Sequence, residues 1–171
     1  MGSSSTARIL RLALAVIGLD QVTKLLVLKY LGFAEEKTVV TGFFKLVHWG
    51  NTGAAWSMFT GNNGVLAVIA GVALVVLFLS RHHFNHHTLG GQISLGLIFG
   101  GIVGNLIDRL LPSRQHVIDF LYFYVIRRDG EIASFPAFNV ADSAICIGVG
   151  LLFILSWQAG PDSTAPGETR G

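Results

Sequence analysis

Four aspartates stand within or directly beside apolar stretches of this chain: Asp20, Asp108, Asp119 and Asp142. An ionised carboxyl group in hydrocarbon costs roughly 2.5 to 3.5 kcal/mol on the lenient insertion scale, so such a group faces other protein and usually has a task. Asp142 has no cation one helical turn away, and only Asn139 stands beside it at i−3. Asp119 interrupts the apolar run Val117 to Phe120. Both acids are therefore candidates for chemistry.

Two carboxyl groups that share one site can activate water. Mutual repulsion and burial raise one pKa, so near neutral pH one carboxyl holds a proton while the other is ionised. The ionised member acts as a general base on water, and the protonated member donates to the carbonyl oxygen of an amide. A pair of acids brought together by the fold therefore predicts hydrolysis of a peptide bond without a covalent intermediate.

Other hydrolytic sites have little support in the sequence. It contains neither the His-Glu-x-x-His pattern of zinc proteases nor the Gly-x-Ser-x-Gly turn of serine hydrolases. Ser57 with Lys24 is a conceivable serine-lysine pair, but nothing in their spacing argues for it. A short connection contains four histidines at spacings that include i,i+4, namely His82, His83, His86 and His87. They form either a metal site or, more commonly, a solvated loop, and we assign no metal and no cofactor.

The remaining polar groups have structural as well as functional interpretations. Asp20 and Lys24 are i,i+4 on one helical face, so they are able to neutralise each other. Arg109 shares a face with Asn105 and is free to reach an acid on another element as a clamp, whereas the adjacent Asp108 points elsewhere.

The composition indicates a membrane protein, with 51% hydrophobic residues, 13% charged residues and a mean hydropathy of +0.60. An intrinsically disordered chain is excluded by the same figures, because disorder goes with few apolar residues. Cys146 is the single cysteine, so no internal disulfide forms. The net charge of +2 and the lack of a long basic run argue against nucleic acid as a partner.

Hydropathy predicts an all-α integral membrane protein of one domain, 1–171, with four transmembrane helices at about 9–28, 64–80, 89–111 and 136–158. The first span resembles a cleavable signal peptide, but Asp20 and Lys24 stand where the small residues of a cleavage site belong. The fourth is expected to begin at Pro136, and the polar tail 160–171 is expected to be disordered.

Two long connections separate the spans. Residues 31–63 contain short β-type runs with glycines and predict a small β-rich region between helices 1 and 2 that lies at the membrane interface. Residues 112–135 are apolar in part but too short to cross, which predicts an interfacial segment between helices 3 and 4. Because consecutive spans alternate in direction, both connections and all the polar residues named above except the histidines fall at or near one face.

Five motifs in order resemble those of the signal peptidase II family: Asp20-Gln21-x-x-Lys24, Asn51-Thr52-Gly53-Ala54-Ala55-Trp56-Ser57, Gly104-Asn105-Leu106-Ile107-Asp108-Arg109, Val117-Ile118-Asp119-Phe120 and Phe138-Asn139-Val140-Ala141-Asp142. The resemblance implies an aspartyl endopeptidase of the bacterial inner membrane. Its substrates would be prolipoproteins, cut just before a cysteine that carries diacylglycerol. In the family, the catalytic aspartates match Asp119 and Asp142.

The resemblance also implies supporting roles for other residues that match the motifs: Asp20, Lys24, Asn51, Asn105, Asp108, Arg109 and Asn139. It places the site on the periplasmic or outer face, whereas the count of Lys and Arg alone does not set the orientation. We expect a monomer whose partners are lipid-modified prolipoproteins and membrane lipids. The alternative is a small proton-coupled transporter that uses Asp20 or Asp142 as a relay, and the one-sided placement of the acids favours the enzyme.

Overall fold

The computed structural model describes residues 2–53 and 61–159. Two earlier expectations fall outside the described residues: the conceivable pairing of Ser57 with Lys24, and the disorder of the polar tail 160–171. Four α-helices are present in the described part: α1 (Gly2–Tyr30), α2 (Asn63–Ser80), α3 (Leu89–Leu110) and α4 (Val140–Ala159). A short 3-10 helix, η2 (Arg81–Phe84), follows α2 directly.

Three helical stretches in the described chain are long and apolar enough to cross a membrane, at 63–84, 89–110 and 140–158. Helix α1 is longer, at 29 residues. It is also more polar, because Arg8, Arg11, Asp20, Lys24 and Lys29 interrupt its apolar sequence. The structure is thus that of a membrane protein with three strongly apolar helices and one long helix of mixed character.

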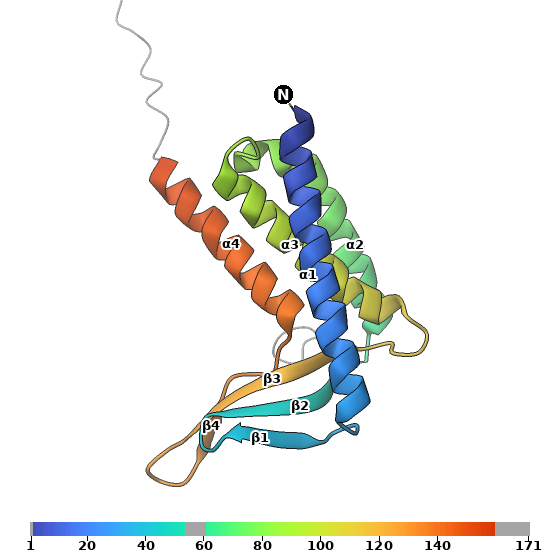
Figure 1. Cartoon of the computed structure of the whole chain (residues 1–171), viewed down its shortest axis with the longest axis vertical. Helices are drawn as coiled ribbons and strands as arrows, with labels where there is room; N and C mark the ends of the chain where they lie inside the picture. The colour runs from blue at the N-terminus through green and yellow to red at the C-terminus, as the bar shows by residue number, and fades with distance from the viewer. Residues whose placement is uncertain (1, 54–60, 160–171) are drawn as a thin grey trace, which may run out of the picture.

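Helix α3 is the centre of the bundle, packed between α1 and α4 and also in contact with α2 (Figure 1). Glycines on α3 permit this close packing. A Cβ atom at Gly100 would lie 2.7 Å from the Cβ of Val16 on α1, and one at Gly104 would lie 2.7 Å from Oδ2 of Asp20. Glycines at four-residue spacing on α3 therefore form a helix-packing surface against α1.

A four-stranded antiparallel sheet lies at one end of the bundle, opposite the N-terminus (Figure 1). Its strands are β1 (Glu36–Val40), β2 (Phe44–Asn51), β3 (Val117–Ile126) and β4 (Ile132–Ser134), in that spatial order. Strands β1 and β2 come from the first long connection, and β3 and β4 come from the second. The two connections, which the sequence presented as separate regions, therefore build one sheet.

Helix α4 begins at Val140, four residues later than the proline start predicted from the sequence. The physical reason is that the chain before it stays extended: Phe138 forms an isolated bridge with Leu121, and its carbonyl oxygen accepts from the amides of Phe120 and Leu121 at 3.1 and 2.9 Å. The extended segment ties the start of α4 to β3.

A small apolar core fixes the sheet to the helices. Val27 near the end of α1 packs with Ile118 and Phe120 of β3, and all three side chains are buried. Val140 at the start of α4 packs against the same cluster. Because these apolar residues flank Asp119 on β3, the core also fixes the height at which that acid stands.

Candidate active site

Asp119 is held on β3 by amide side chains from two other elements. Asn51 at the end of β2 donates from Nδ2 to Oδ2 of Asp119 at 2.9 Å, and Asn139 donates from Nδ2 to Oδ1 at 2.8 Å. The pairing of β2 with β3, in which Trp49 lies opposite Asp119, brings Asn51 within reach. Both carboxyl oxygens therefore accept a hydrogen bond, although the residue is only 4% exposed.

The pKa of Asp119 is raised from its ordinary value to about 7. Burial is the main cause, because it penalises the charged form, and the nearby carboxyl group of Asp142 adds to the effect. The hydrogen bonds from Asn51 and Asn139 act in the opposite direction. Near neutral pH this carboxyl therefore gains and loses its proton readily, as a group that exchanges protons during a reaction must.

Asp142 is the third residue of α4 and forms a capping box with Asn139. The amide of Asp142 donates to Oδ1 of Asn139 at 2.9 Å, and the amide of Asn139 donates to Oδ2 of Asp142 at 3.1 Å. This reciprocal pair satisfies two backbone N–H groups at the helix start. Asn139 therefore bonds to both acids, since its Nδ2 atom donates to Asp119 while its backbone holds Asp142.

Asn105 connects Asp142 to a buried lysine on α1. Its Nδ2 atom donates to Oδ1 of Asp142 at 2.7 Å, and its Oδ1 atom accepts from Nζ of Lys24 at 3.0 Å. The amide orientation is fixed by these contacts, because an ammonium group donates and a carboxylate accepts. Three helices thus meet at Asp142 through one asparagine.

Lys24 lies between two carboxylates that are as fully buried as it is. Its Nζ atom is 2.8 Å from Oδ2 of Asp20 and 2.6 Å from Oδ2 of Asp108, and all three side chains have no exposure. The expected pairing of Asp20 with Lys24 is therefore present, and Asp108 joins it. The second oxygen of Asp20 accepts from the amide of Ala141 at 3.0 Å, so an acid on α1 also caps the start of α4.

The sequence interpretation missed two members of this network, Arg114 and Gln21. Arg114 forms an ion pair with Oδ1 of Asp108 and donates from Nη1 to Oε1 of Gln21 at 2.9 Å. Gln21 donates from Nε2 to Asp20 and to the Gly104 carbonyl, both at 3.1 Å. Arg114 follows α3 in a non-helical connection, so no helical spacing related it to Asp108. Gln21 belongs to the motif Asp20-Gln21-x-x-Lys24, but the sequence indicated no role for its side chain.

Arg109 holds two elements together as expected, but its hydrogen-bond partners are not the acid that the sequence suggested. Its guanidinium donates to Oδ1 of Asn63 at 3.0 Å and to the carbonyl oxygen of Gly53 at 2.9 Å. Asn63 in turn donates to the Arg109 carbonyl at 2.9 Å. In the described part of the chain Arg109 therefore binds neutral oxygens near the end of β2 and the start of α2, rather than an acid on another element.

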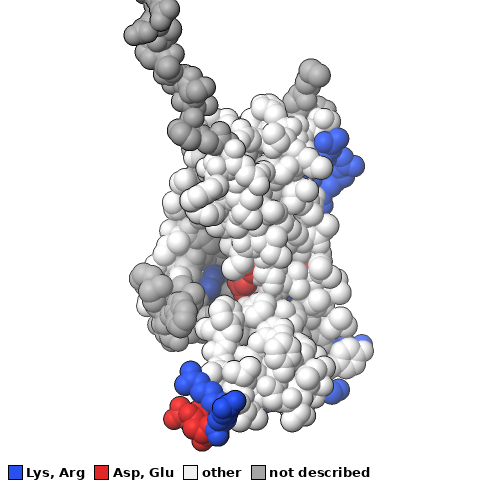
Figure 2. Space-filling model, turned by 90° about the vertical axis from the view of Figure 1, so that its left-hand side faces the viewer, with Lys and Arg blue, Asp and Glu red and all other residues white. Residues whose placement is uncertain are grey.

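The space-filling view shows basic and acidic side chains inside a hollow between the helices and the sheet (Figure 2). The described surface around this hollow is uncharged, and most other charges on that face lie toward its two ends. Among the described residues, no three His, Cys, Asp or Glu side chains are arranged to hold a metal ion. The arrangement offers two carboxyl groups, one with a pKa near neutrality, surrounded by fixed amide donors.

The chain resembles known proteins over most of its length. A family model described as "Signal peptidase (SPase) II" matches residues 12–158. Proteins named lipoprotein signal peptidase are similar to it: one from Symbiobacterium thermophilum is 41% identical, with 84% of this chain and 90% of that protein covered. One from Chlorobium phaeovibrioides is 42% identical, covering 91% and 94%.

A solved structure described as a bacterial membrane enzyme superposes with a TM-score of 0.75 at 28% identity, covering 100% of this chain and 96% of that one. A second solved bacterial membrane enzyme gives a TM-score of 0.72 at 29% identity, covering 91% and 94%. The fold is therefore that of a membrane enzyme with apolar helices and a small antiparallel sheet.

Proposed function

The chain belongs to the signal peptidase II family, and on this premise we propose that it is an aspartic endopeptidase that removes signal peptides from prolipoproteins. The cut falls immediately before the cysteine that carries a thioether-linked diacylglycerol. The observation that carries this proposal is the hydrogen-bonded group in which Asn139 bonds to both Asp119 and Asp142. Shared donors of this kind hold two carboxyl groups at one site, as a water-activating pair requires.

In the proposed reaction, Asp119 and Asp142 share one proton. The ionised carboxyl accepts a proton from water as the water oxygen attacks the scissile carbonyl carbon, and the protonated carboxyl donates to the carbonyl oxygen. Collapse of the tetrahedral intermediate returns a proton to the leaving amine and breaks the C–N bond. No group of the enzyme becomes covalently attached to the substrate.

The surrounding amides supply orientation in this mechanism. Asn51 holds Asp119 at 2.9 Å and Asn105 holds Asp142 at 2.7 Å, so each acid has one donor of its own in addition to Asn139. Fixed donors limit the reorganisation needed when charge moves between the carboxyl groups. Behind the two acids, Lys24 donates to Asn105 and pairs with Asp108, and Asp20 accepts from the amide of Ala141 at the start of α4. Arg109 binds Asn63 and so fixes the start of α2.

We further propose that α1 is a fourth transmembrane helix, so that 1–171 is one membrane domain in the bacterial inner membrane. Its charged residues Asp20 and Lys24 face the bundle interior, where they are fully buried, rather than lipid. The sheet then lies at the periplasmic or outer interface, next to the acids, and the monomer contains the whole site. A substrate anchored by two acyl chains presents its scissile bond at that height.

A proton-coupled transporter is the weaker proposal. Transport needs access to the relay from both faces. The described acids of the bundle, Asp20, Asp108 and Asp142, all lie in its sheet-side half, and between Asn62 and Ile107 the sequence has no acid at all. Family membership also favours proteolysis.

The test compares one prolipoprotein precursor before and after diacylglyceryl transfer, incubated with purified protein. Burial of acyl chain contributes about 0.8 kcal/mol per CH₂, so the lipidated precursor should be cleaved far faster. Asp119→Asn and Asp142→Asn should each abolish cleavage, with Asp129→Asn on the exposed β3–β4 turn as the matched control. Equal cleavage rates for the two precursors would show that the enzyme does not recognise the lipid. Activity in either the Asp119→Asn or the Asp142→Asn variant would exclude the proposed dyad mechanism.

A further inference from the structure

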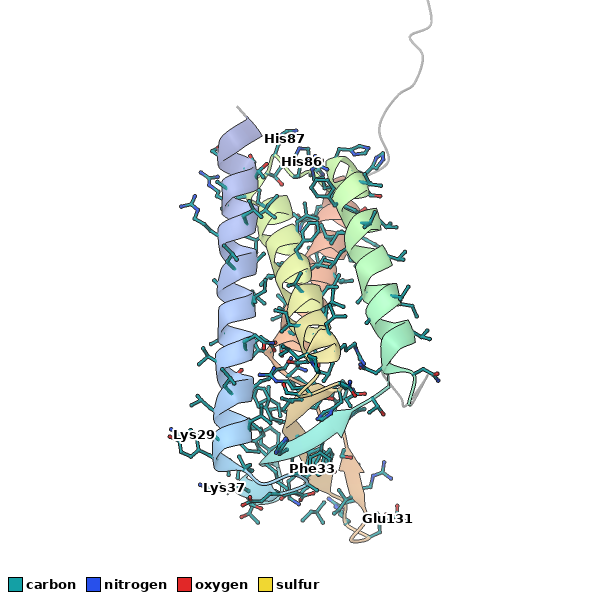
Figure 3. The ribbon with its side chains drawn as sticks, turned by 90° about the vertical axis from the view of Figure 1, so that its right-hand side faces the viewer. Lys29, Phe33, Lys37, His86, His87 and Glu131 are labelled. Atoms are coloured by element: carbon teal, nitrogen blue, oxygen red, sulfur yellow. The ribbon has the colours of Figure 1, made fainter. Side chains whose placement is uncertain are left out.

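The end of the bundle opposite the sheet contains an unusual turn between α2 and α3. Figure 3 shows His86 and His87 at this end, while Lys29, Phe33 and Glu131 lie at the sheet end. The turn consists of η2 and residues 85–88, and Thr88 caps α3 by accepting from the amide of Gly91 at 3.1 Å. It contains four histidines and Arg81, and the proposed peptidase mechanism uses none of them.

The imidazole rings of the turn lie in two close pairs, each with its two ring planes tilted relative to one another. The ring centroids of His82 and His83 are 3.9 Å apart, and those of His86 and His87 are 3.7 Å apart. Protonation of both members of a pair places like charges in contact, which is unfavourable unless an anion lies nearby. The sequence from 61 to 107 holds no acidic residue, so neither α2, the turn nor the adjoining part of α3 supplies a carboxylate as that anion.

The pKa of His86 is lowered from its ordinary value, first by burial and then by the neighbouring His87, Arg81 and His82. The parts of the neighbouring helices that lie near the turn add positive charge and no acid among the described residues. Arg8 of α1 donates to Oε1 of Gln92 at 3.4 Å, and Gln92 donates to the carbonyl oxygen of His87 at 3.1 Å, so α1 extends the basic region across the start of α3. Arg11 follows one turn later on α1. The described residues of α3 and α4 near the turn, 89–96 and 149–158, include no titratable side chain.

A cavity of about 540 Å³ opens beside this turn. Its polar rim includes His83 and Asn85 from the turn and Ser156 from α4. The rest of its lining is apolar: Phe84, Val149, Leu152, Phe153 and Leu155. The cavity thus has a polar rim that includes one histidine of the turn, and an apolar lining contributed mainly by α4.

We propose that this cavity binds an anionic phospholipid, with the headgroup phosphate at the histidine turn and an acyl chain along α4. Two features match the two parts of such a lipid: basic groups at the turn with no acid near them among the described residues, and an apolar lining beside the turn that includes Phe153 and Leu155. The N-terminus of α3, which begins at the same turn, adds partial positive charge. A free phosphate ion would use only the first feature.

The proposed binding depends on pH. An ordinary histidine is half protonated near pH 6.5, and a bound phosphate favours the charged form. Affinity should therefore rise as pH falls from about 8 to about 5.5. Arg81 stays charged throughout, so a weaker preference for anionic lipid remains at the higher pH. This proposal is independent of the peptidase dyad, since it involves the opposite end of the bundle.

Native mass spectrometry of delipidated protein with equal amounts of phosphatidylglycerol and phosphatidylcholine of identical chains tests the proposal. We expect phosphatidylglycerol adducts to exceed phosphatidylcholine adducts by about fivefold or more at about pH 5.5, with a smaller ratio at about pH 8. A fourfold His→Gln variant at positions 82, 83, 86 and 87 should lose the pH dependence. Arg127→Gln with Arg128→Gln, which removes basic charge at the sheet end, is the matched control and should keep it.

Two further arms keep the result interpretable. Leu152→Trp fills the cavity and should reduce adducts of both lipids without touching the histidines, so it tests the site even if the fourfold variant fails to fold. Glycerol phosphate, which lacks acyl chains, should not displace the lipid. Equal adducts of the two lipids, a pH-dependent preference that survives in the fourfold variant, or displacement by glycerol phosphate would each overturn the proposal.

Discussion

Lys24 Nζ lies 2.6 Å from Asp108 Oδ2, and neither side chain has any exposure. The lysine also pairs with Asp20, and Asp108 also pairs with Arg114, so two cations and two acids form a buried network with no net charge. Asn105 connects Lys24 to Asp142 through contacts of 3.0 and 2.7 Å. Asp142, a candidate catalytic acid, is therefore positioned through Asn105 by an ion network that is neutral only when all four of its charged side chains are present.

Asp108→Asn should destabilise the protein by about 3 to 5 kcal/mol, because removal of one partner leaves buried cations uncompensated. The variant keeps the volume of the side chain but withdraws the charge that two cations share. Thermal unfolding in detergent is the measurement, and Asp129→Asn is the control because it lies in the exposed turn between β3 and β4. An unfolding temperature that matches wild type would mean that Lys24 needs only Asp20.

Arg114→Gln should lower stability less than Asp108→Asn does, by about 1 to 3 kcal/mol. The glutamine still donates to an acceptor, but Asp108 loses a charged partner whose side chain is only 9% exposed. Arg114→Lys restores the charge without the forked geometry and should recover part of the loss. Unfolding curves of the two variants, compared with the exposed Arg127→Gln, decide the matter. Equal effects of Gln and Lys would show that geometry rather than charge is what Arg114 contributes.

Sequence reasoning found the acids because a charge in an apolar stretch is visible without a structure. Asp119 and Asp142 were identified this way, and the i,i+4 spacing of Asp20 and Lys24 predicted an ion pair that is present. Arg114 was missed because it contacts Asp108 through a turn, and turn geometry leaves no periodic signal. Arg109 was expected to meet an acid, since a cation in an apolar segment suggests one, yet neutral oxygens accept its hydrogen bonds.

The sheet was predictable only in part, for a related reason. The β-type runs of 31–63 predicted strands, and β1 and β2 are found there. The pairing of β2 with β3 joins segments about 70 residues apart, and such long-range pairing is not encoded in local pattern. Likewise Pro136 suggested a helix start, whereas the Asn139-x-x-Asp142 spacing of a capping box marks the observed start at Val140.

Asp119→Asn should abolish cleavage and, at about pH 8, stabilise the folded protein by a few kcal/mol. The pKa of Asp119 is raised from 3.8 to about 7 in the folded state, so the folded protein holds this proton more tightly than the unfolded chain does. Stability contributed by this group is therefore present at low pH and lost as pH rises from about 4 through about 7. Asparagine keeps one acceptor oxygen, but its NH2 group then faces the NH2 donor of Asn51 or Asn139, a cost of about 1 to 3 kcal/mol that offsets part of the gain.

Unfolding temperatures of Asp119→Asn and wild type, measured at about pH 5 and about pH 8, test this sign. The stabilising effect of the variant should be larger at the higher pH. Asp129→Asn should show no such difference, because its side chain is in an exposed turn. A variant that is less stable than wild type at the higher pH would mean that the buried carboxylate is better solvated than its contacts indicate.

Cleavage of a lipidated precursor should fall as pH rises through about 7, because the proposed dyad needs one proton and the pKa of Asp119 is raised to about 7. Burial is the main cause of that shift, with the Asp142 carboxyl second. Asn51 donates to Asp119 at 2.9 Å, and that hydrogen bond favours the charged form. Asn51→Val removes the donor at similar volume, so it should move the alkaline limb of the pH–rate profile to higher pH. A variant that lowers the rate equally at every pH would assign Asn51 to substrate binding, and a profile flat to about pH 9 would exclude Asp119 as the proton donor.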